Sequence, residues 1–311
     1  MTKAGAVKCA RSFFANQYQP LRRSAMFLQT ISNGLLIGSL YALVGMGMAI
    51  IFGTMRIINF AHGEFMMIGM YVTYSICSAF HVDPYVTIPA SFLVTFALGY
   101  AAFKGLIAKI MLSSDMNQIL MTAGISMVLT NLAQMKYTSD QLTLNLDYAN
   151  KSVKFANIQL NIPYLISFII AIVITILIFY FIMRTETGRA MRAISQNRTS
   201  SFLMGIHVEK VSSFVFAIGI ALAGVAGTLL LPVYRVSPTV GGGFTLLAFV
   251  VVVLGGMGSI EGAALGGFII GVVQALSAYY LGGSYGDLIT YVVFLLILLL
   301  KPSGLLGRSR S

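Results

Sequence analysis

Hydrophobic residues along this chain gather in long runs that are separated by short polar stretches. The runs cover about residues 26–51, 64–80, 86–108, 118–135, 162–183, 211–231, 244–257, 260–280 and 287–300. A helix needs roughly 20 apolar residues to cross the hydrocarbon core of a membrane. The pattern therefore predicts an all-α, polytopic transmembrane helix bundle of about eight or nine spans, with residues 26–311 forming a single domain.

The first glycine-bounded interruption, from Gly53 to Phe65, carries Asn59, His62 and Glu64. It is too short for an extramembrane loop, so it is expected to dip into the bilayer, where non-helical backbone survives only if it is buried in protein or lines a cavity. Ionisable residues at such a place are candidates for a translocation path. Alternatively, they hold the break in shape by capping helix ends or bonding each other. One His and one Glu do not complete a metal shell, so no metal site is expected.

A second glycine-rich interruption runs from Gly255 to Gly267. Glycine-interrupted segments at corresponding positions of two halves are typical of transport proteins that are built from repeats. The second interruption resembles the first only loosely. Counting how often the chain crosses the membrane places both interruptions on the cytoplasmic side, which predicts two repeats that run parallel to each other. The alternative is that these glycines only allow close helix packing.

The polar segment 184–210 lies between two strongly apolar runs and holds five basic residues against two acidic ones. A short loop with such an excess of Lys and Arg faces the cytoplasm. Within it Ala190, Ala193 and Ile194 recur at helical spacing, which predicts a short amphipathic helix. Another protein could grip this helix, or its charges could serve only to orient the neighbouring spans.

Counting crossings outward from this segment places 136–161 and the N-terminus outside and the C-terminal tail inside. The basic tail agrees with the positive-inside rule, whereas the basic residues 1–25 do not. This conflict favours the hypothesis that 1–25 are a basic N-terminal extension foreign to the native protein, and that translation starts at Met26.

Composition supports a membrane protein, because 58% of the 311 residues are hydrophobic and only 9% are charged, against about 25% charged in a soluble domain. The net charge of +11 sits mainly between the spans and reflects topology, so no nucleic-acid partner is expected. There is no P-loop, H-E-x-x-H or G-x-S-x-G motif. The chain therefore looks like a transport subunit that does not bind or hydrolyse ATP itself, and neither a cofactor nor an enzyme activity is expected.

Several stretches resemble the permease subunits of branched-chain amino acid ABC importers. They are NGLLIGSLYALVGMGMAIIFGTMRIINFAHGEFMMIGMYV (33–72), TGRAMRAISQNRTSSFLMGIHVEKVSSFVFAIGIALAGVAGTL (187–229), VVLGGMGSIEGAALGGFIIGVVQAL (252–276) and KPSGLLG (301–307). The resemblance extends over essentially 26–307 but adds nothing for 136–160. It implies a multi-pass permease of the bacterial cytoplasmic membrane that forms half of a path for Leu, Ile and Val.

The resemblance also implies partners: a second related permease, two cytoplasmic ATP-binding subunits that hydrolyse the ATP, and an extracytoplasmic substrate-binding protein. Related permeases serve urea or short amides, which stay alternative substrates. A self-sufficient secondary transporter is another alternative, although only Glu64 and Glu261 are acids near its spans. A membrane-integral enzyme would need a catalytic constellation that the residues do not supply.

In importers of this family a cytoplasmic loop acts as a coupling helix in a groove of the ATPase. The resemblance carries that role onto six positions of this chain: Gly188, Arg189, Arg192, Ala193, Asn197 and Gly205. Small residues would allow close seating, arginines can pair with carboxylates, and glycines let the chain turn.

Overall fold

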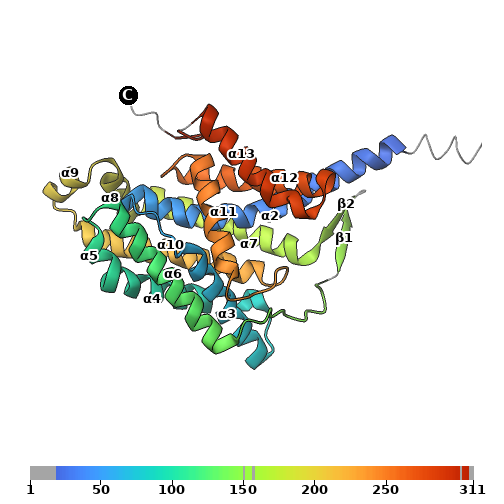
Figure 1. The fold of residues 1–311 in the computed structure, drawn as a ribbon, viewed down its shortest axis with the longest axis horizontal. Coiled ribbons are helices and arrows are strands. Elements are labelled where there is room, and N and C mark those ends of the chain that lie inside the picture. Colours follow the sequence, from blue (N-terminus) through green and yellow to red (C-terminus); the bar gives the residue numbers. More distant parts are fainter. Residues whose placement is uncertain (1–18, 150, 156–157, 302, 308–311) are drawn as a thin grey trace, which may run out of the picture.

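The computed structural model describes residues 19–149, 151–155, 158–301 and 303–307. Helices dominate it, which confirms the all-α bundle, and each of the nine predicted runs falls on a helix (Figure 1). The first helix begins at Gln19, seven residues before the predicted start of the span. Residues 1–18, most of the predicted N-terminal extension, lie outside the described residues.

The elements have the following bounds: α2 (Gln19–Met55), α3 (His62–Phe80), η1 (Pro84–Thr87), α4 (Ile88–Ala102), η2 (Phe103–Ile107, a π-helix), α5 (Ala108–Ile110), α6 (Asp115–Tyr137), β1 (Ser152–Phe155), β2 (Ile158–Asn161), α7 (Ile162–Arg184), α8 (Glu186–Gln196), α9 (Arg198–Leu203), α10 (Val208–Leu230), α11 (Val240–Gly255), α12 (Ile260–Leu281), η3 (Gly283–Tyr285) and α13 (Gly286–Leu300). The antiparallel pair β1–β2 is an addition to the predicted all-α fold. It lies in the polar loop 138–161, outside the apolar runs.

Five helices in the described part of the chain are long and apolar enough to cross a membrane. They are Met26–Met55, Pro84–Ile110, Ile162–Arg184, Val208–Leu230 and Ile260–Leu281, while α11 and α13 are shorter apolar helices. Pro84–Ile110 is a single continuous span made of η1, α4, η2 and α5. The lengths and compositions fit an integral membrane protein.

The two polar loops lie at opposite ends of the bundle, as the crossing count predicts (Figure 1). At one end, which we call the outer end, Gln29 near the start of α2 is hydrogen-bonded to Gln159 of β2, whose backbone N–H donates to Oε1 of Gln29 over 2.6 Å. At the other end, which we call the basic end, α8 packs against α2, α7 and α10. The C-terminal tail joins the basic end, because Leu305 N–H donates to the Leu254 carbonyl at the end of α11.

Helices α2 and α10 pack against each other at the centre of the bundle and are the most deeply buried of its spans. A Cβ on Gly47 of α2 would lie 2.5 Å from the carbonyl oxygen of Gly219, and a Cβ on Gly219 would lie 2.6 Å from that of Gly47. The two backbones therefore touch, which only glycine permits. Helix α12 covers α2, and α4 covers α10.

The fold holds two similar units, each a long helix, a non-helical break and a second helix that starts within the bundle. The first unit is α2, 56–61 and α3, and the second is α10, 231–239 and α11. They meet a second time where the backbones of Gly63 and Gly241 touch reciprocally. Because α2 ends at the basic end and α10 begins there, the two units run in opposite directions, and the repeat is inverted.

This arrangement corrects the parallel repeat that the sequence led us to expect. The partner of the first break is 231–239, whereas the stretch from Gly255 to Gly267 holds a turn that links α11 to α12 at the basic end. Its Gly258 packs against Gly53, within 3.0 Å of where a Cβ of Gly53 would lie. The glycines there mark close packing between helices, which was the alternative interpretation.

The first break does dip into the bundle. The Nε2 atom of His62 lies 3.0 Å from the carbonyl oxygen of Val44, eleven residues before α2 ends at Met55. At a rise of 1.5 Å per residue, α3 therefore begins about 16 Å inside the end of α2. The break itself is only 56–61, shorter than predicted, and it starts at Arg56 with a left-handed φ of 57°.

Candidate functional site

Segment 184–210 folds into two short helices, α8 and α9, at the basic end, which confirms the predicted amphipathic helix. Thr185 ends α7 and caps α8, since its Oγ1 accepts a hydrogen bond of 3.1 Å from the Gly188 N–H. The buried face of α8 consists of Gly188, Met191 and Ile194. This face packs against the bundle and leaves the other face of α8 open.

Gly188 faces inward, toward α7. A Cβ at this position would collide with the backbone of Ile182, including its carbonyl oxygen. Glycine thus lets α8 fold back directly against the last turn of α7. The small residue that was expected to seat a partner instead seats α8 on its own bundle.

Arg192 strengthens the same junction. Its guanidinium donates a hydrogen bond to the carbonyl of Ile182, in the last turn of α7. Carbonyls at a helix C-terminus have no partner within the helix and carry partial negative charge, so a guanidinium is a favourable cap. Ala193, beside it, is partly buried. Arg192 therefore fixes α8 to α7.

Arg189, Asn197 and Gly205 occupy the exposed side of the segment. Arg189 pairs only with Glu186, at 3.5 Å, and both side chains are largely in solvent. Asn197 ends α8 in an extended conformation and caps α9, because its Oδ1 accepts from the Ser200 N–H at 2.9 Å. Gly205 has a φ of 84° and open space around it, which suits the turn from α9 into α10.

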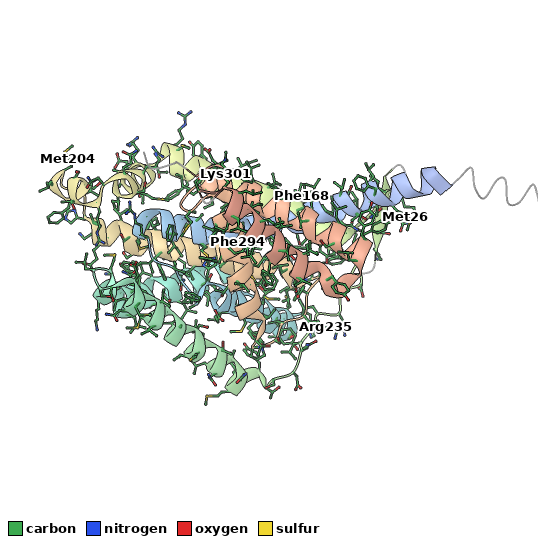
Figure 2. All side chains as sticks on the ribbon, turned by 45° about the horizontal axis from the view of Figure 1, so that its top comes forward. Met26, Phe168, Met204, Arg235, Phe294 and Lys301 are labelled. Atoms are coloured by element: carbon green, nitrogen blue, oxygen red, sulfur yellow. The ribbon has the colours of Figure 1, made fainter. Side chains whose placement is uncertain are left out.

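Sequence reasoning overlooked the end of α9. Phe202, Leu203 and Met204 are 69%, 79% and 83% exposed, and Met204 lies at the far tip of the molecule (Figure 2). Three consecutive exposed apolar side chains at the tip of a molecule are typical of an interaction site. The signal was present in the sequence as an apolar SFLMG stretch within an otherwise polar loop.

The predicted intramembrane residues come together with α11 of the opposite unit. Asn59, His62 and Glu64 are at most 3% exposed. The Gly63 N–H donates to Oγ1 of Thr245 over 2.8 Å, and the Thr245 hydroxyl lies 3.2 Å from Oε2 of Glu64. The N-terminal turns of α3 and α11 are thus joined by one buried polar network.

Two atoms of this network have no partner: Nδ2 of Asn59 and Nδ1 of His62. The His62 ring must donate from Nε2, because the atom that faces it is the Val44 carbonyl oxygen. Unpaired buried polar atoms are uncommon and costly. Within the described residues there is no group of three His, Cys, Asp or Glu side chains that could hold a metal ion.

The outer end carries the stretch 141–147, which has little regular secondary structure and which we call the outer strap. Leu142 exchanges two backbone hydrogen bonds with Val236, of 2.9 and 3.0 Å, and so ties the strap to the second break. Tyr148 follows the strap and donates to Asp83 over 2.5 Å. Burial, and next this hydrogen bond, raise the pKa of the Tyr148 hydroxyl, so it stays protonated as a donor.

Comparison with known proteins agrees with this architecture. Residues 30–298 match the family model described as the permease component of the branched-chain amino acid transport system. The high-affinity branched-chain amino acid transport permease LivH of Salmonella typhimurium is 34% identical over 300 residues, which cover 91% of this chain and 96% of that protein. The corresponding permease BraD of Pseudomonas aeruginosa is 31% identical over 297 residues, again 91% and 96% of the two chains. No solved structure gives a significant match. The chain, an integral membrane protein, therefore belongs to the family of branched-chain amino acid transport permeases.

Proposed function

We propose that this chain is the permease subunit of an ATP-driven importer that carries branched-chain amino acids across the bacterial cytoplasmic membrane. It forms half of the translocation path together with a second related permease. Two cytoplasmic ATP-binding subunits drive it from the basic end, and an extracytoplasmic binding protein delivers the substrate at the outer end. Its relatives LivH and BraD are named as branched-chain amino acid transport permeases, and this supports branched-chain amino acids as the substrate class.

One observation carries the coupling role: α8 is fixed to the bundle, whereas α9 projects from it. Gly188 and Arg192 lock α8 against the end of α7, and α8 also packs against α2 and α10. A force on α8 is therefore passed to three long helices at once. The exposed side chains of Arg189, Leu203 and Met204 form the surface that an ATP-binding subunit contacts.

The intramembrane network is assigned to the translocation path of the same importer. Asn59, His62 and Glu64 are buried, so their part is to hold the break that shapes the wall of the path. The break is joined to α11 through Thr245, so a shift of α11 against α3 would change the path at mid-membrane. Exchange between inward and outward opening by such relative motion is a common transport device.

A matched pair of charge insertions tests the coupling role. Leu203→Asp changes an exposed side chain at the tip of α9, and Val153→Asp changes an exposed one, 48% accessible, on β1 at the outer end. Neither is expected to disturb folding, because neither side chain is packed. Leu203→Asp should abolish co-purification of the ATP-binding subunits and uptake of leucine, whereas Val153→Asp should leave co-purification intact. Normal assembly and uptake by the Leu203→Asp protein would refute the assignment.

Two alternatives are separated by further measurements. A permease for urea or short amides would work with a binding protein that is stabilised against heat by those compounds and not by leucine. A self-sufficient secondary transporter would move substrate in liposomes that contain this chain alone under an ion gradient. Glu64 is the only buried acid in the described residues, and we expect no such uptake without the ATP-binding subunits.

A further inference from the structure

A cavity of about 670 Å³ lies at the basic end, between α9, the first turns of α10 and the end of the Pro84–Ile110 span. Its lining comes from segments that are far apart in the sequence. The residues are Lys104, Leu112, Arg198, Thr199, Phe202, His207, Val208, Glu209, Lys210 and Ser213. None of the roles considered so far uses this space, although α9 forms one of its walls.

The charge of the lining is strongly biased. Three permanently basic side chains, Lys104, Arg198 and Lys210, face the cavity with a single carboxylate, Glu209. They come from three different elements, η2, α9 and α10. Within the described residues none of the three makes a salt bridge, since the one ion pair there joins Arg189 to Glu186. A partly enclosed space with this excess of positive charge favours an anion.

The position of Lys104 decides what kind of anion can enter. Lys104 belongs to the π-helical turn η2, six residues before the apolar span ends at Ile110, which is about 9 Å along the helix. Its Nζ lies 5.0 Å from the centre of the Tyr100 ring, and Tyr and Lys at such a depth are typical of the headgroup region. The floor of the cavity thus reaches the membrane boundary, where a lipid headgroup lies and where a water-soluble subunit does not extend.

The apolar walls of the cavity form a surface on which the acyl chain of a lipid can lie. Leu112 and Phe202 line the cavity and are 85% and 69% exposed. Phe214, one turn further into the membrane than Lys210 on α10, is exposed as well. Exposed apolar surface that continues from a basic pocket toward the hydrocarbon suits an acyl chain below a phosphate group.

We propose that this cavity binds an anionic phospholipid of the cytoplasmic leaflet, with its phosphate among Lys104, Arg198 and Lys210 and its acyl chain along Phe202 and Phe214. The lipid joins the tip of α9 to the end of the Pro84–Ile110 span. Membrane composition then controls how firmly α9 is held. The proposal does not depend on which substrate the importer carries, nor on how the ATP-binding subunits attach.

The sequence contains no tryptophan, so a single introduced one reports on the cavity alone. Phe202→Trp places the fluorophore in the wall, and Leu299→Trp places one on α13, at a side chain 81% exposed and outside the cavity. Each protein is reconstituted with acyl-brominated phosphatidylglycerol or with acyl-brominated phosphatidylcholine, and the quenching is compared. The anionic lipid should quench the Phe202→Trp protein at lower mole fraction than the neutral lipid, and the two lipids should quench the Leu299→Trp protein alike.

Charge removal completes the test, because juxtamembrane cations each add roughly fivefold to anionic lipid binding. In the Phe202→Trp protein, Lys104→Gln should weaken the preference for phosphatidylglycerol about fivefold, and adding Lys210→Gln should abolish it. Lys109→Gln removes an equally exposed lysine of the same span that does not line the cavity, and it should leave the preference within twofold. Equal quenching by both lipids, or an equal effect of the Lys104 and Lys109 changes, would overturn the proposal.

Discussion

Replacing Gly63 with alanine tests whether α3 and α11 meet inside the membrane as closely as the structure shows. A Cβ at Gly63 would lie 2.6 Å from both N and Oγ1 of Thr245, and closer still to the carbonyl oxygen of Gly241. Even the longer of these distances is about 0.8 Å inside the 3.4 Å at which ordinary contact begins. Most of the opposing atoms are backbone, so the helices themselves must separate.

The cost of that separation has two parts. Overpacking a closely packed interior costs about 1–3 kcal/mol. Moving α11 away also breaks the 2.8 Å hydrogen bond from the Gly63 N–H to the Thr245 hydroxyl, and a buried donor left without a partner costs about 1–3 kcal/mol. We therefore expect Gly63→Ala to destabilise the protein by about 2–6 kcal/mol and to lower uptake.

Thermal unfolding of the purified protein in detergent, followed by its helical circular dichroism, measures the effect. Gly124→Ala is the matched control, because Gly124 lies within α6 and a Cβ there would meet nothing within 4 Å. Alanine should stabilise that helix by up to about 1 kcal/mol. The two substitutions are thus expected to shift the unfolding midpoint in opposite directions. A Gly63→Ala protein that unfolds no earlier than the wild type would show that the two helices do not touch here.

Two further predictions concern the outer end. A Leu142→Cys/Val236→Cys protein without native cysteines should form a disulfide, because these residues exchange two backbone hydrogen bonds. Oxidation should stop uptake, and reduction should restore it. Full uptake by a completely cross-linked protein would show that the second break stays fixed during transport. Tyr148→Phe removes the hydrogen bond to Asp83 and should lower stability by roughly 1.5 kcal/mol, whereas Tyr180→Phe, at a side chain 65% exposed, should leave the unfolding midpoint unchanged.

Length and hydropathy made the helices predictable, because each span must supply its own apolar run to cross the membrane. The depth of the break before His62 was also predictable, since the polar stretch there is too short to leave the bilayer. The second break, 231–239, was not recognised. Its Pro232, Tyr234 and Arg235 have the composition of an ordinary outer loop. What places it within the bundle is the contact of Gly241 with Gly63, which joins residues 178 positions apart in the chain.

The face of α8 that meets the bundle could not be assigned from its amphipathic pattern. The amphipathic pattern indicates which side chains are shielded from water, but it does not indicate whether the bundle or a partner protein shields them. Gly188 illustrates this ambiguity, because the same small residue would suit a groove in another subunit or the end of α7. The backbone geometry decides for α7, where a Cβ would strike Ile182. Arg192 is hydrogen-bonded at the same junction, whereas Arg189, Asn197 and Gly205 stay exposed.

The way α9 is attached indicates how a pull on it reaches the bundle. Toward α10 the chain passes through Gly205, which has a left-handed φ of 84° and no neighbour within 4 Å of a Cβ. Backbone hydrogen bonds from Gly205 to Phe202 and from Ile206 to Ser201 hold this turn to the end of α9. Toward α8 the single residue Asn197 belongs to both helices, since its N–H bonds back to Ala193 and its side chain caps α9. Motion of α9 is therefore passed both through α8 into α7 and directly into α10, and α8 also packs against α10.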